Sequence, residues 1–151
     1  MKINTRIFGE VTVSDDKIIH ITGGIIGFPD LRDFTIIHNS EKRDGRVAWL
    51  VSIQEPAFAL PVMDPLVVVP DYNPVVEEEV LKPIGDLAEQ DLLVLVTITV
   101  PKNPKNISVN LKAPIIINAK ERKACQIIID GDEYAIKFPI YEKLNVLKEG
   151  E

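Results

Sequence analysis

The stretch Leu92-Leu93-Val94-Leu95-Val96-Thr97-Ile98-Thr99-Val100 decides the fold class of this chain. Its first half is continuously apolar, its second half alternates threonine with valine and isoleucine, and Pro101 ends it. A short uninterrupted apolar run of this kind is typical of a strand that is buried on both faces. We therefore expect this segment at the centre of a closed or sandwiched sheet, with Leu93, Leu95 and Ile98 in the core.

Short strand-like runs continue on both sides of this stretch. Most hold β-branched or aromatic residues and end near a glycine, a proline or a polar turn. They cover residues 3–8, 17–22, 34–38, 47–53, 58–63, 66–69, 107–111, 114–117, 125–129 and 134–138, the last after a hairpin turn signal at 130–132. This pattern predicts a mainly-β fold: a single-domain antiparallel β-barrel or sandwich over residues 1–151, with a C-terminal tail from about residue 141.

Helix is expected in one region only. Prolines at positions 56, 61, 65, 70 and 74 recur every four or five residues and exclude a helix from that part of the chain. Residues 75–80 and 84–89 allow helix, but Pro83 and Gly85 interrupt them. We therefore expect one or two short helices there, each of one or two turns.

The composition allows a hydrophobic core without covalent support. The chain has 151 residues, of which 46% are hydrophobic, and a domain of this size buries roughly two-thirds of the surface that its unfolded chain exposes. The single cysteine, Cys125, has no partner for an internal disulfide and lies beside Ile127, so we expect a small buried residue there. Phe28 and Trp49 have apolar neighbours, and we expect both to be structural anchors.

Residues that carry catalysis or hold a metal are scarce. Two histidines and one cysteine are too few for the three or four clustered ligands of a usual metal site. The stretch Gly23-Gly24-Ile25-Ile26-Gly27 lacks the lysine of a phosphate-binding loop, and we expect it to form a bend that brings Phe28 against the core. The chain also lacks the serine elbow of hydrolases. We expect no enzymatic activity, no cofactor and no metal.

The sequence gives no sign of a membrane or export segment. The N-terminal residues lack the long apolar region of a signal peptide. The longest apolar stretch, residues 92–100, is too short to cross a bilayer. We expect a cytoplasmic protein that does not bind a membrane.

Charge is distributed unevenly along the chain. Residues 71–91 hold seven acidic residues and one base, Lys82, a net charge of −6 that equals the net charge of the whole chain. Residues 102–123 hold six bases and one acid, Glu121. An acidic segment repels a phosphate backbone and attracts a basic protein. An ordinary solvated surface is the alternative explanation.

Several motifs, taken in order, resemble one protein family. They are Gly24-Ile25-Ile26-Gly27-Phe28-Pro29, Trp49-Leu50-Val51-Ser52, Pro56-Ala57-Phe58-Ala59-Leu60-Pro61-Val62, Pro70-Asp71-Tyr72, the block from Asn110 to Asn118, and then Gln126, Tyr134 and Pro139. Each motif alone is weak, but their joint order resembles the FliW family of bacterial flagellar assembly factors over nearly the whole chain. Val51 stands where the family usually has glutamine.

The resemblance implies a regulator without catalytic activity. FliW-like proteins bind newly made flagellin in the cytoplasm and also bind CsrA, a small RNA-binding protein that represses flagellin translation. Free FliW captures CsrA and relieves that repression, at a site away from the RNA surface. For this chain we expect contact with CsrA through the acidic segment, at Asp71, Tyr72, Glu77, Glu78 and Glu79, and no direct contact with nucleic acid.

Two other functions stay open at this point. The lysines between residues 102 and 123 allow a nucleic-acid-binding barrel of the OB type. A closed barrel is also able to hold a small ligand inside. The sequence does not indicate which face meets flagellin and which meets CsrA.

Overall fold

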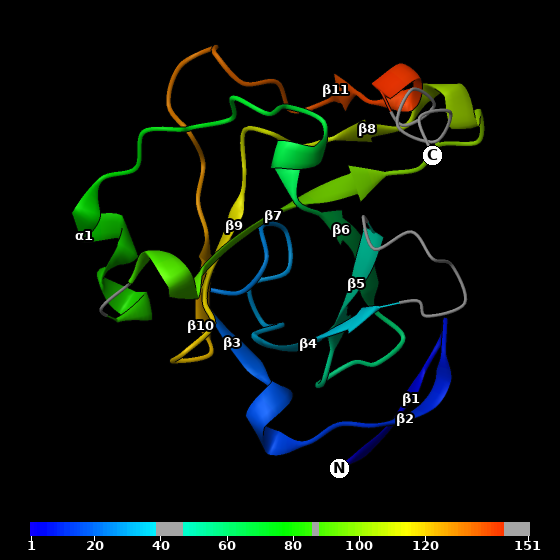
Figure 1. The fold of residues 1–151 in the computed structure, drawn as a ribbon. Coiled ribbons are helices and arrows are strands. Elements are labelled where there is room, and N and C mark those ends of the chain that lie inside the picture. The colour runs from blue at the N-terminus through cyan, green and yellow to red at the C-terminus, as the bar shows by residue number, and fades with distance from the viewer. Residues whose placement is uncertain (39–46, 86–87, 144–151) are drawn as a thin grey trace.

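The computed structural model describes residues 1–38, 47–85 and 88–143. Figure 1 shows a chain built mostly of strands. The strands are β1 (Lys2–Thr5), β2 (Gly9–Thr12), β3 (Ile19–Thr22), β4 (Asp33–His38), β5 (Val47–Ser52), β6 (Ala59–Met63), β7 (Leu92–Thr99), β8 (Ser108–Val109), β9 (Ile115–Asn118), β10 (Lys123–Gln126) and β11 (Phe138–Pro139). The chain also contains one short α-helix, α1 (Glu78–Leu81), among the described residues. Short 3₁₀ turns occur at Asp15–Lys17, Pro65–Val67, Lys82–Ile84, Glu89–Asp91 and Pro104–Asn106.

Seven strands close into a barrel. The ring runs β7-β6-β5-β4-β3-β10-β9 and returns to β7, because β7 pairs with β9 from Leu92↔Asn118 to Leu95↔Ile115. The predicted mainly-β fold is confirmed, in its barrel form. The expectation of purely antiparallel pairing is wrong at one place, since β3 and β10 run parallel. These two strands are far apart in the chain, so no hairpin connects them. A short hairpin turn forces two consecutive strands to run antiparallel, and that constraint does not apply to β3 and β10.

The central strand β7 behaves largely as its sequence predicts. Leu95, Val96 and Ile98 are buried, and Leu93 is half-buried against the core. The first residue of the run departs from the expectation, because the side chain of Leu92 remains 43% exposed. The barrel interior is filled by apolar side chains from every strand of the ring, among them Ile21, Phe34, Leu50, Val62, Ile115 and Ala124.

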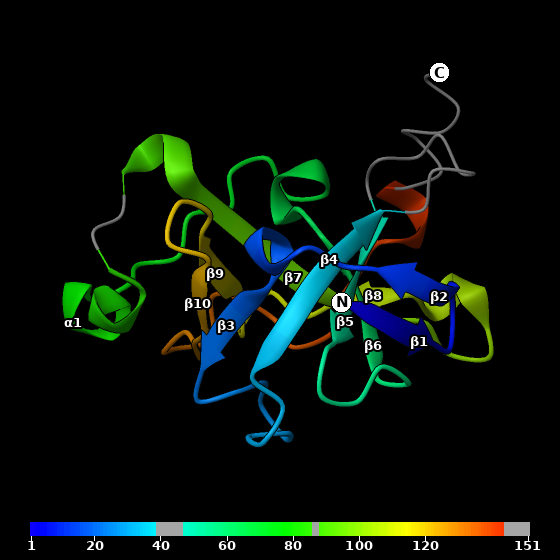
Figure 2. The ribbon, with the colours of Figure 1, turned by 90° about the horizontal axis from the view of Figure 1, so that it is seen from below.

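Two further layers cover the outside of the barrel. The β1–β2 hairpin packs on β5, where Ile3 and Val13 form a buried cluster with Val51. Trp49 is half-buried in the same cluster and meets the Phe8 ring edge-on at 6.4 Å between centroids, which confirms its anchoring role. β7 also extends past the barrel to pair with β8 and, through it, β11. In Figures 1 and 2 this extension and α1 lie on opposite sides of the barrel.

The loop between β3 and β4 closes one end of the barrel. Gly24 has φ 72°, and a Cβ there would lie 2.6 Å from the carbonyl oxygen of Pro29, so the tight bend requires glycine. The expectation that Phe28 is a core anchor is wrong: its side chain is 48% exposed, and its ring rests on that of Phe58 at 4.6 Å. Phe34 and Ile25 already fill the interior beneath it, so Phe28 lies outside them.

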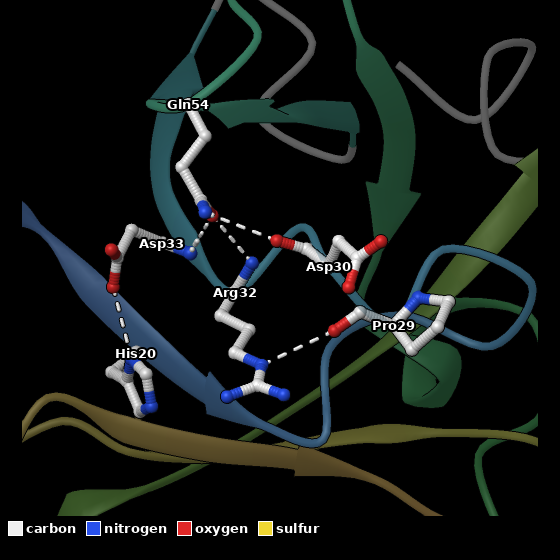
Figure 3. A network of polar contacts seen from close by, with 6 residues as sticks. All are labelled: His20, Pro29, Asp30, Arg32, Asp33 and Gln54. Atoms are coloured by element: carbon white, nitrogen blue, oxygen red, sulfur yellow. Dashed lines mark hydrogen bonds and ion pairs between the residues drawn. The ribbon is translucent and has the colours of Figure 1, made fainter.

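A polar network holds this loop in place (Figure 3). The side-chain oxygen of Gln54 accepts hydrogen bonds from the backbone N–H groups of Arg32 and Asp33, and its Nε2 donates to the carbonyl of Asp30. Arg32 Nε donates to the Pro29 carbonyl, and His20 Nδ1 lies 2.9 Å from Asp33 Oδ1. These side chains join the loop to β3 and to the β5–β6 connection, in addition to the backbone hydrogen bonds from the Ile21 N–H to the Arg32 carbonyl and from the Ile53 N–H to the Asp33 carbonyl.

Two other expectations from the sequence need correction. The hairpin expected after residues 130–132 does not form: residues 131–134 and 136–137 adopt bends, and only Phe138–Pro139 pair, with β8. Within this stretch the carbonyl of Ala135 accepts an isolated backbone hydrogen bond from the N–H of Leu111. Short helices at 75–80 and 84–89 are confirmed in part by α1 and the turn at Lys82–Ile84, while residues 86–87 and the tail at 144–151 lie outside the described residues.

Candidate interaction surface

The acidic residues chosen from the sequence lie on the segment that connects β6 to β7. In Figure 1 this segment leaves the barrel after β6, runs out to α1 on the side of β9 and β10, and comes back to the start of β7. Asp71 and the three glutamates 77, 78 and 79 are exposed. Within the described residues, the ion pairs are Lys2–Glu10 and His20–Asp33, so these four carboxylates have no cationic partner there.

Tyr72 does not belong to this exposed set, and its expected role as a contact residue stays a prediction. Its side chain is only 7% exposed, and its hydroxyl donates a 2.7 Å hydrogen bond to the carbonyl of Leu111. Its ring meets that of Tyr134 at 4.7 Å between centroids. Burial raises the pKa of the Tyr72 hydroxyl to about 12, and the nearby Tyr134 adds to this rise. Tyr72 therefore attaches the segment to the body of the protein through a buried contact.

The rest of the segment is attached by a small set of contacts. The Tyr134 hydroxyl accepts from the backbone N–H of Asn73 at 3.1 Å. At the far end, Ile84 is fully buried and its carbonyl accepts a 2.9 Å hydrogen bond from Nδ2 of the buried Asn118. Between these points Val76 and Leu81 pack against a buried cluster formed by Ile84, Ile116, Cys125, Ile127 and Ile129. The exposed glutamates thus project from a segment whose apolar side faces the barrel.

An apolar groove of about 440 Å³ lies along this segment. Its lining is apolar except for Asp64 and Asn73. The other lining residues are Pro65, Leu66, Tyr72, Pro74, Val76, Leu81, Leu92, Leu93, Val94, Pro114 and Ile116. Sequence reasoning did not find this groove, because its walls come from four separate parts of the chain. The available signal was Leu92, an apolar residue directly after Asp91 at the end of the acidic segment.

The basic residues between 102 and 123 do not form one strip. Lys102 and Lys105 belong to the β7–β8 connection, whereas Lys120 and Lys123 lie at the β9–β10 turn, and Figure 1 places these two connections at opposite sides of the molecule. Arg122 donates from Nη1 to the carbonyl of Asp15 and so is committed within the fold. A nucleic acid needs a continuous cationic track, so this arrangement does not favour the OB-type alternative.

A larger cavity, of about 830 Å³, opens at one end of the barrel. Its inner wall consists of core side chains such as Ile19, Val62 and Leu95. Polar and charged residues join the lining; they are Thr12, Ser14, Asp16, Lys17, Thr35, His38, Asp64 and Arg122. This combination of an apolar wall and polar groups is the feature expected of a ligand-binding barrel.

Groups suited to metal or thiol chemistry are few among the described residues. In the part of the chain that the structure describes, no three histidine, cysteine, aspartate or glutamate residues are grouped so as to hold a metal ion. Cys125 is buried, and this burial raises the pKa of its thiol, which keeps it protonated and weakly nucleophilic. The same described residues contain no helix with the length and apolar character needed to cross a bilayer.

Comparison with known proteins identifies the family. Residues 2–140 match the family described as "FliW protein". This chain belongs to the FliW family. The flagellar assembly factor FliW of Lachnospira eligens is 43% identical over 153 residues, which cover 100% of this chain and 99% of that protein. The flagellar assembly factor FliW of Lachnoclostridium phytofermentans is 40% identical over 144 residues, covering 95% of this chain and 92% of that protein.

A solved structure gives the same result for the fold. The crystal structure of a flagellar assembly factor FliW aligns with a TM-score of 0.84 and 26% identity, covering 93% of this chain and 97% of that one. The family resemblance drawn from the motifs is therefore confirmed. The relatives are named as assembly factors, which is not a catalytic role.

Proposed function

We propose that this FliW-family chain is a cytoplasmic, non-enzymatic flagellar assembly factor that binds flagellin. When free of flagellin, it binds the RNA-binding translational regulator CsrA and antagonises CsrA repression of flagellin synthesis. Family membership supports the assembly role, since the relatives carry that name. The proposal includes one domain, no cofactor, no metal, and no direct contact with nucleic acid or membrane.

The observation that carries the CsrA contact is the exposed acidic face. Residues 71–91 bear the whole formal net charge of −6, and Asp71, Glu77, Glu78 and Glu79 are exposed without a cationic partner among the described residues. An RNA-binding protein carries cationic surface to meet phosphates. Such a surface is complementary to this face, and the same negative charge keeps RNA away from it.

The test measures binding of purified flagellin and purified CsrA to the chain, singly and in competition. Each should bind, and flagellin should displace CsrA or be displaced by it. The triple variant Glu77→Gln, Glu78→Gln, Glu79→Gln should bind CsrA with a slower association rate and a weaker dependence of that rate on salt, because exposed charges act mainly on association.

A matched triple variant controls for net charge. Glu10→Gln, Glu55→Gln, Glu142→Gln removes three exposed charges outside the acidic segment and should leave CsrA association close to wild type. Equal behaviour of the two triple variants would assign the effect to overall charge and reject the acidic face as the contact. Failure of the wild type to bind CsrA would reject that partner.

A second candidate function, small-ligand binding, is supported by the 830 Å³ cavity at the barrel end. A ligand that fills this cavity protects the buried walls from solvent and stabilises the folded state by mass action. Native mass spectrometry of the freshly purified chain tests it: a bound small molecule, released on denaturation, supports this function, and a mass equal to the bare chain under gentle conditions counts against it.

A further inference from the structure

The cavity at the barrel end combines an apolar wall with cationic side chains at its opening. Its volume of about 830 Å³ falls in the range of small-molecule binding sites. The half-buried side chains of Ile36, Val67 and Leu93 belong to its apolar wall. Lys17 and Arg122 line the same cavity and are exposed, so they lie where it meets solvent.

Arg122 is held in an unusual backbone conformation at this opening. Its φ is 56°, and among the described residues it alone has a positive φ without being glycine. Such a conformation is rare for a residue with a long side chain. The Arg122 N–H donates to the Asn118 carbonyl at 2.8 Å, and the Arg122 carbonyl accepts from the His20 N–H at 2.9 Å. Conformations of this kind persist where surrounding contacts hold them, and they cluster at binding sites.

The Arg122 side chain is held close to the turn that carries Lys17. Its Nη1 donates a 2.6 Å hydrogen bond to the carbonyl of Asp15, the first residue of the 3₁₀ turn that ends at Lys17. This bond uses one of the five N–H donors of a guanidinium and leaves the others for a ligand. Within the described residues, neither Arg122 nor Lys17 forms an ion pair with a carboxylate. One side of the opening therefore carries two cations that lack a carboxylate partner there.

Two carboxylates also line the cavity, and they affect how a ligand is oriented. Asp64 follows β6, and its Oδ1 accepts a 2.9 Å hydrogen bond from the Leu66 N–H. An anionic group on a ligand is repelled by Asp64 and attracted by Arg122 and Lys17. Asp16 stands next to Lys17 in the chain and competes with the ligand for the cations. The complementary ligand has its negative charge at one end and an apolar remainder.

We propose that this cavity binds a small organic carboxylate with an apolar tail, such as a short fatty acid. The inference rests on the second candidate function, small-ligand binding, and adds the chemical class of the ligand. Arg122 and Lys17 bind the carboxylate, since the planar guanidinium matches its two oxygens. The tail lies against the apolar wall and is removed from water.

The test is calorimetric titration of the full chain with three probes of equal length, octanoate, octanol and octylamine. Octanoate should bind at least about tenfold more tightly than octanol, because hydrogen bonds to a charged group are the stronger ones. Octylamine should bind more weakly than octanoate, because its charge is opposite. From butyrate to octanoate the affinity should rise about fourfold for each CH₂ that enters the apolar part of the cavity.

Four variants connect the binding to named side chains, and chemical denaturation checks that each one folds. Arg122→Gln should weaken octanoate binding about tenfold or more and leave octanol binding unchanged. Lys17→Gln keeps the Arg122 hydrogen bond and should also weaken octanoate, which preserves the test should Arg122→Gln fold poorly. Asp16→Asn removes the competing charge and should tighten octanoate about two- to fivefold. Lys120→Gln is the matched control, since it removes an exposed cation that does not line the cavity, and it should bind as wild type does.

The opposing outcomes separate this inference from the function on which it rests. Equal binding of octanoate and octanol, with no effect of Arg122→Gln or Lys17→Gln, would overturn the carboxylate and keep a ligand-binding cavity. Tighter binding of octylamine would show that the aspartates select the ligand and would overturn the inference in the same way. If none of the three probes binds, the inference is wrong, and native mass spectrometry of the freshly purified chain decides separately whether the second candidate function stands.

Discussion

Replacing Tyr72 by phenylalanine tests how the acidic segment is attached to the barrel. The change removes one oxygen and leaves the carbonyl of Leu111 without the 2.7 Å hydrogen bond that it now accepts. Both residues are buried, so water does not readily replace the lost donor. An unsatisfied buried acceptor costs about 1–3 kcal/mol, and the free energy of unfolding of Tyr72→Phe near pH 7 should fall by that amount.

The same hydroxyl makes the stability of the wild type depend on alkaline pH. In the folded protein the pKa of Tyr72 is raised to about 12, whereas an unfolded tyrosine titrates near 10. Between these values the unfolded chain binds fewer protons than the folded one, so the free energy of unfolding falls as the pH rises. The contribution, about 2–3 kcal/mol, is complete below pH 10 and is lost as the pH approaches 12.

Urea denaturation of wild type and Tyr72→Phe at pH 7, 9, 10 and 11 measures both effects. The variant should start lower and should lose less stability above pH 10, so the two curves converge. Tyr141→Phe is the matched control, since the Tyr141 hydroxyl makes no hydrogen bond within the described residues, and it should follow wild type. A loss below about 0.5 kcal/mol at pH 7, together with parallel alkaline slopes, would refute the attachment through Tyr72.

Four other outcomes are expected. Leu95→Ala should lower the free energy of unfolding by roughly 2–5 kcal/mol in chemical denaturation, since the side chain is buried inside the barrel. Gly24→Ala should cost more than about 1–2 kcal/mol, because it adds a positive-φ penalty to a 2.6 Å approach to the Pro29 oxygen, measured by the thermal midpoint. Trp49 emission should lie between buried and exposed values and move to the red in Phe8→Ala, since Phe8 covers one edge of the ring. A preparation free of chelator should contain no stoichiometric metal by elemental analysis, since the described residues hold no cluster of ligands.

The sequence was sufficient to predict those features that depend on near neighbours. The apolar run ended by Pro101 predicted β7, and the spacing of prolines excluded long helices between β5 and α1. The burial of Cys125 followed from the isoleucines beside it. In each case the residues that determine the structure stand within a few positions of one another, where periodicity and turn chemistry act directly.

Features that depend on distant contacts were missed. Tyr72 stands among Pro70, Asp71, Asn73 and Pro74, which is a polar, turn-like context, yet it is buried by Leu111 and Tyr134, 39 and 62 positions away. Its neighbours therefore gave no sign of its burial. The parallel pairing of β3 with β10 is determined in the same way, by closure of the ring rather than by any turn.

Two phenylalanines show the same limit. Phe28 stands between Gly27 and Pro29, and Phe34 between Asp33 and Thr35, yet Phe34 is the one inside the barrel, and Phe28 rests half exposed over Phe58. Local context establishes that each ring seeks an apolar surface. Which of them reaches the interior depends on the volume left by the strands of the completed ring, and this is not a property of either segment alone.

The position of the acidic segment explains why charge and fold are separable in this protein. β6 and β7 pair directly at Val62↔Thr97 and Met63↔Val96, so the strand pairing that forms the ring does not involve the residues that connect them. That connection carries the exposed glutamates outward and is attached through Tyr72 and Ile84, whose side chains bear no charge. Changes to the glutamates should therefore alter binding with little effect on the free energy of unfolding. Changes to Tyr72 should instead lower the free energy of unfolding. This separation is what allows the acidic face and the attachment of the segment to be tested independently.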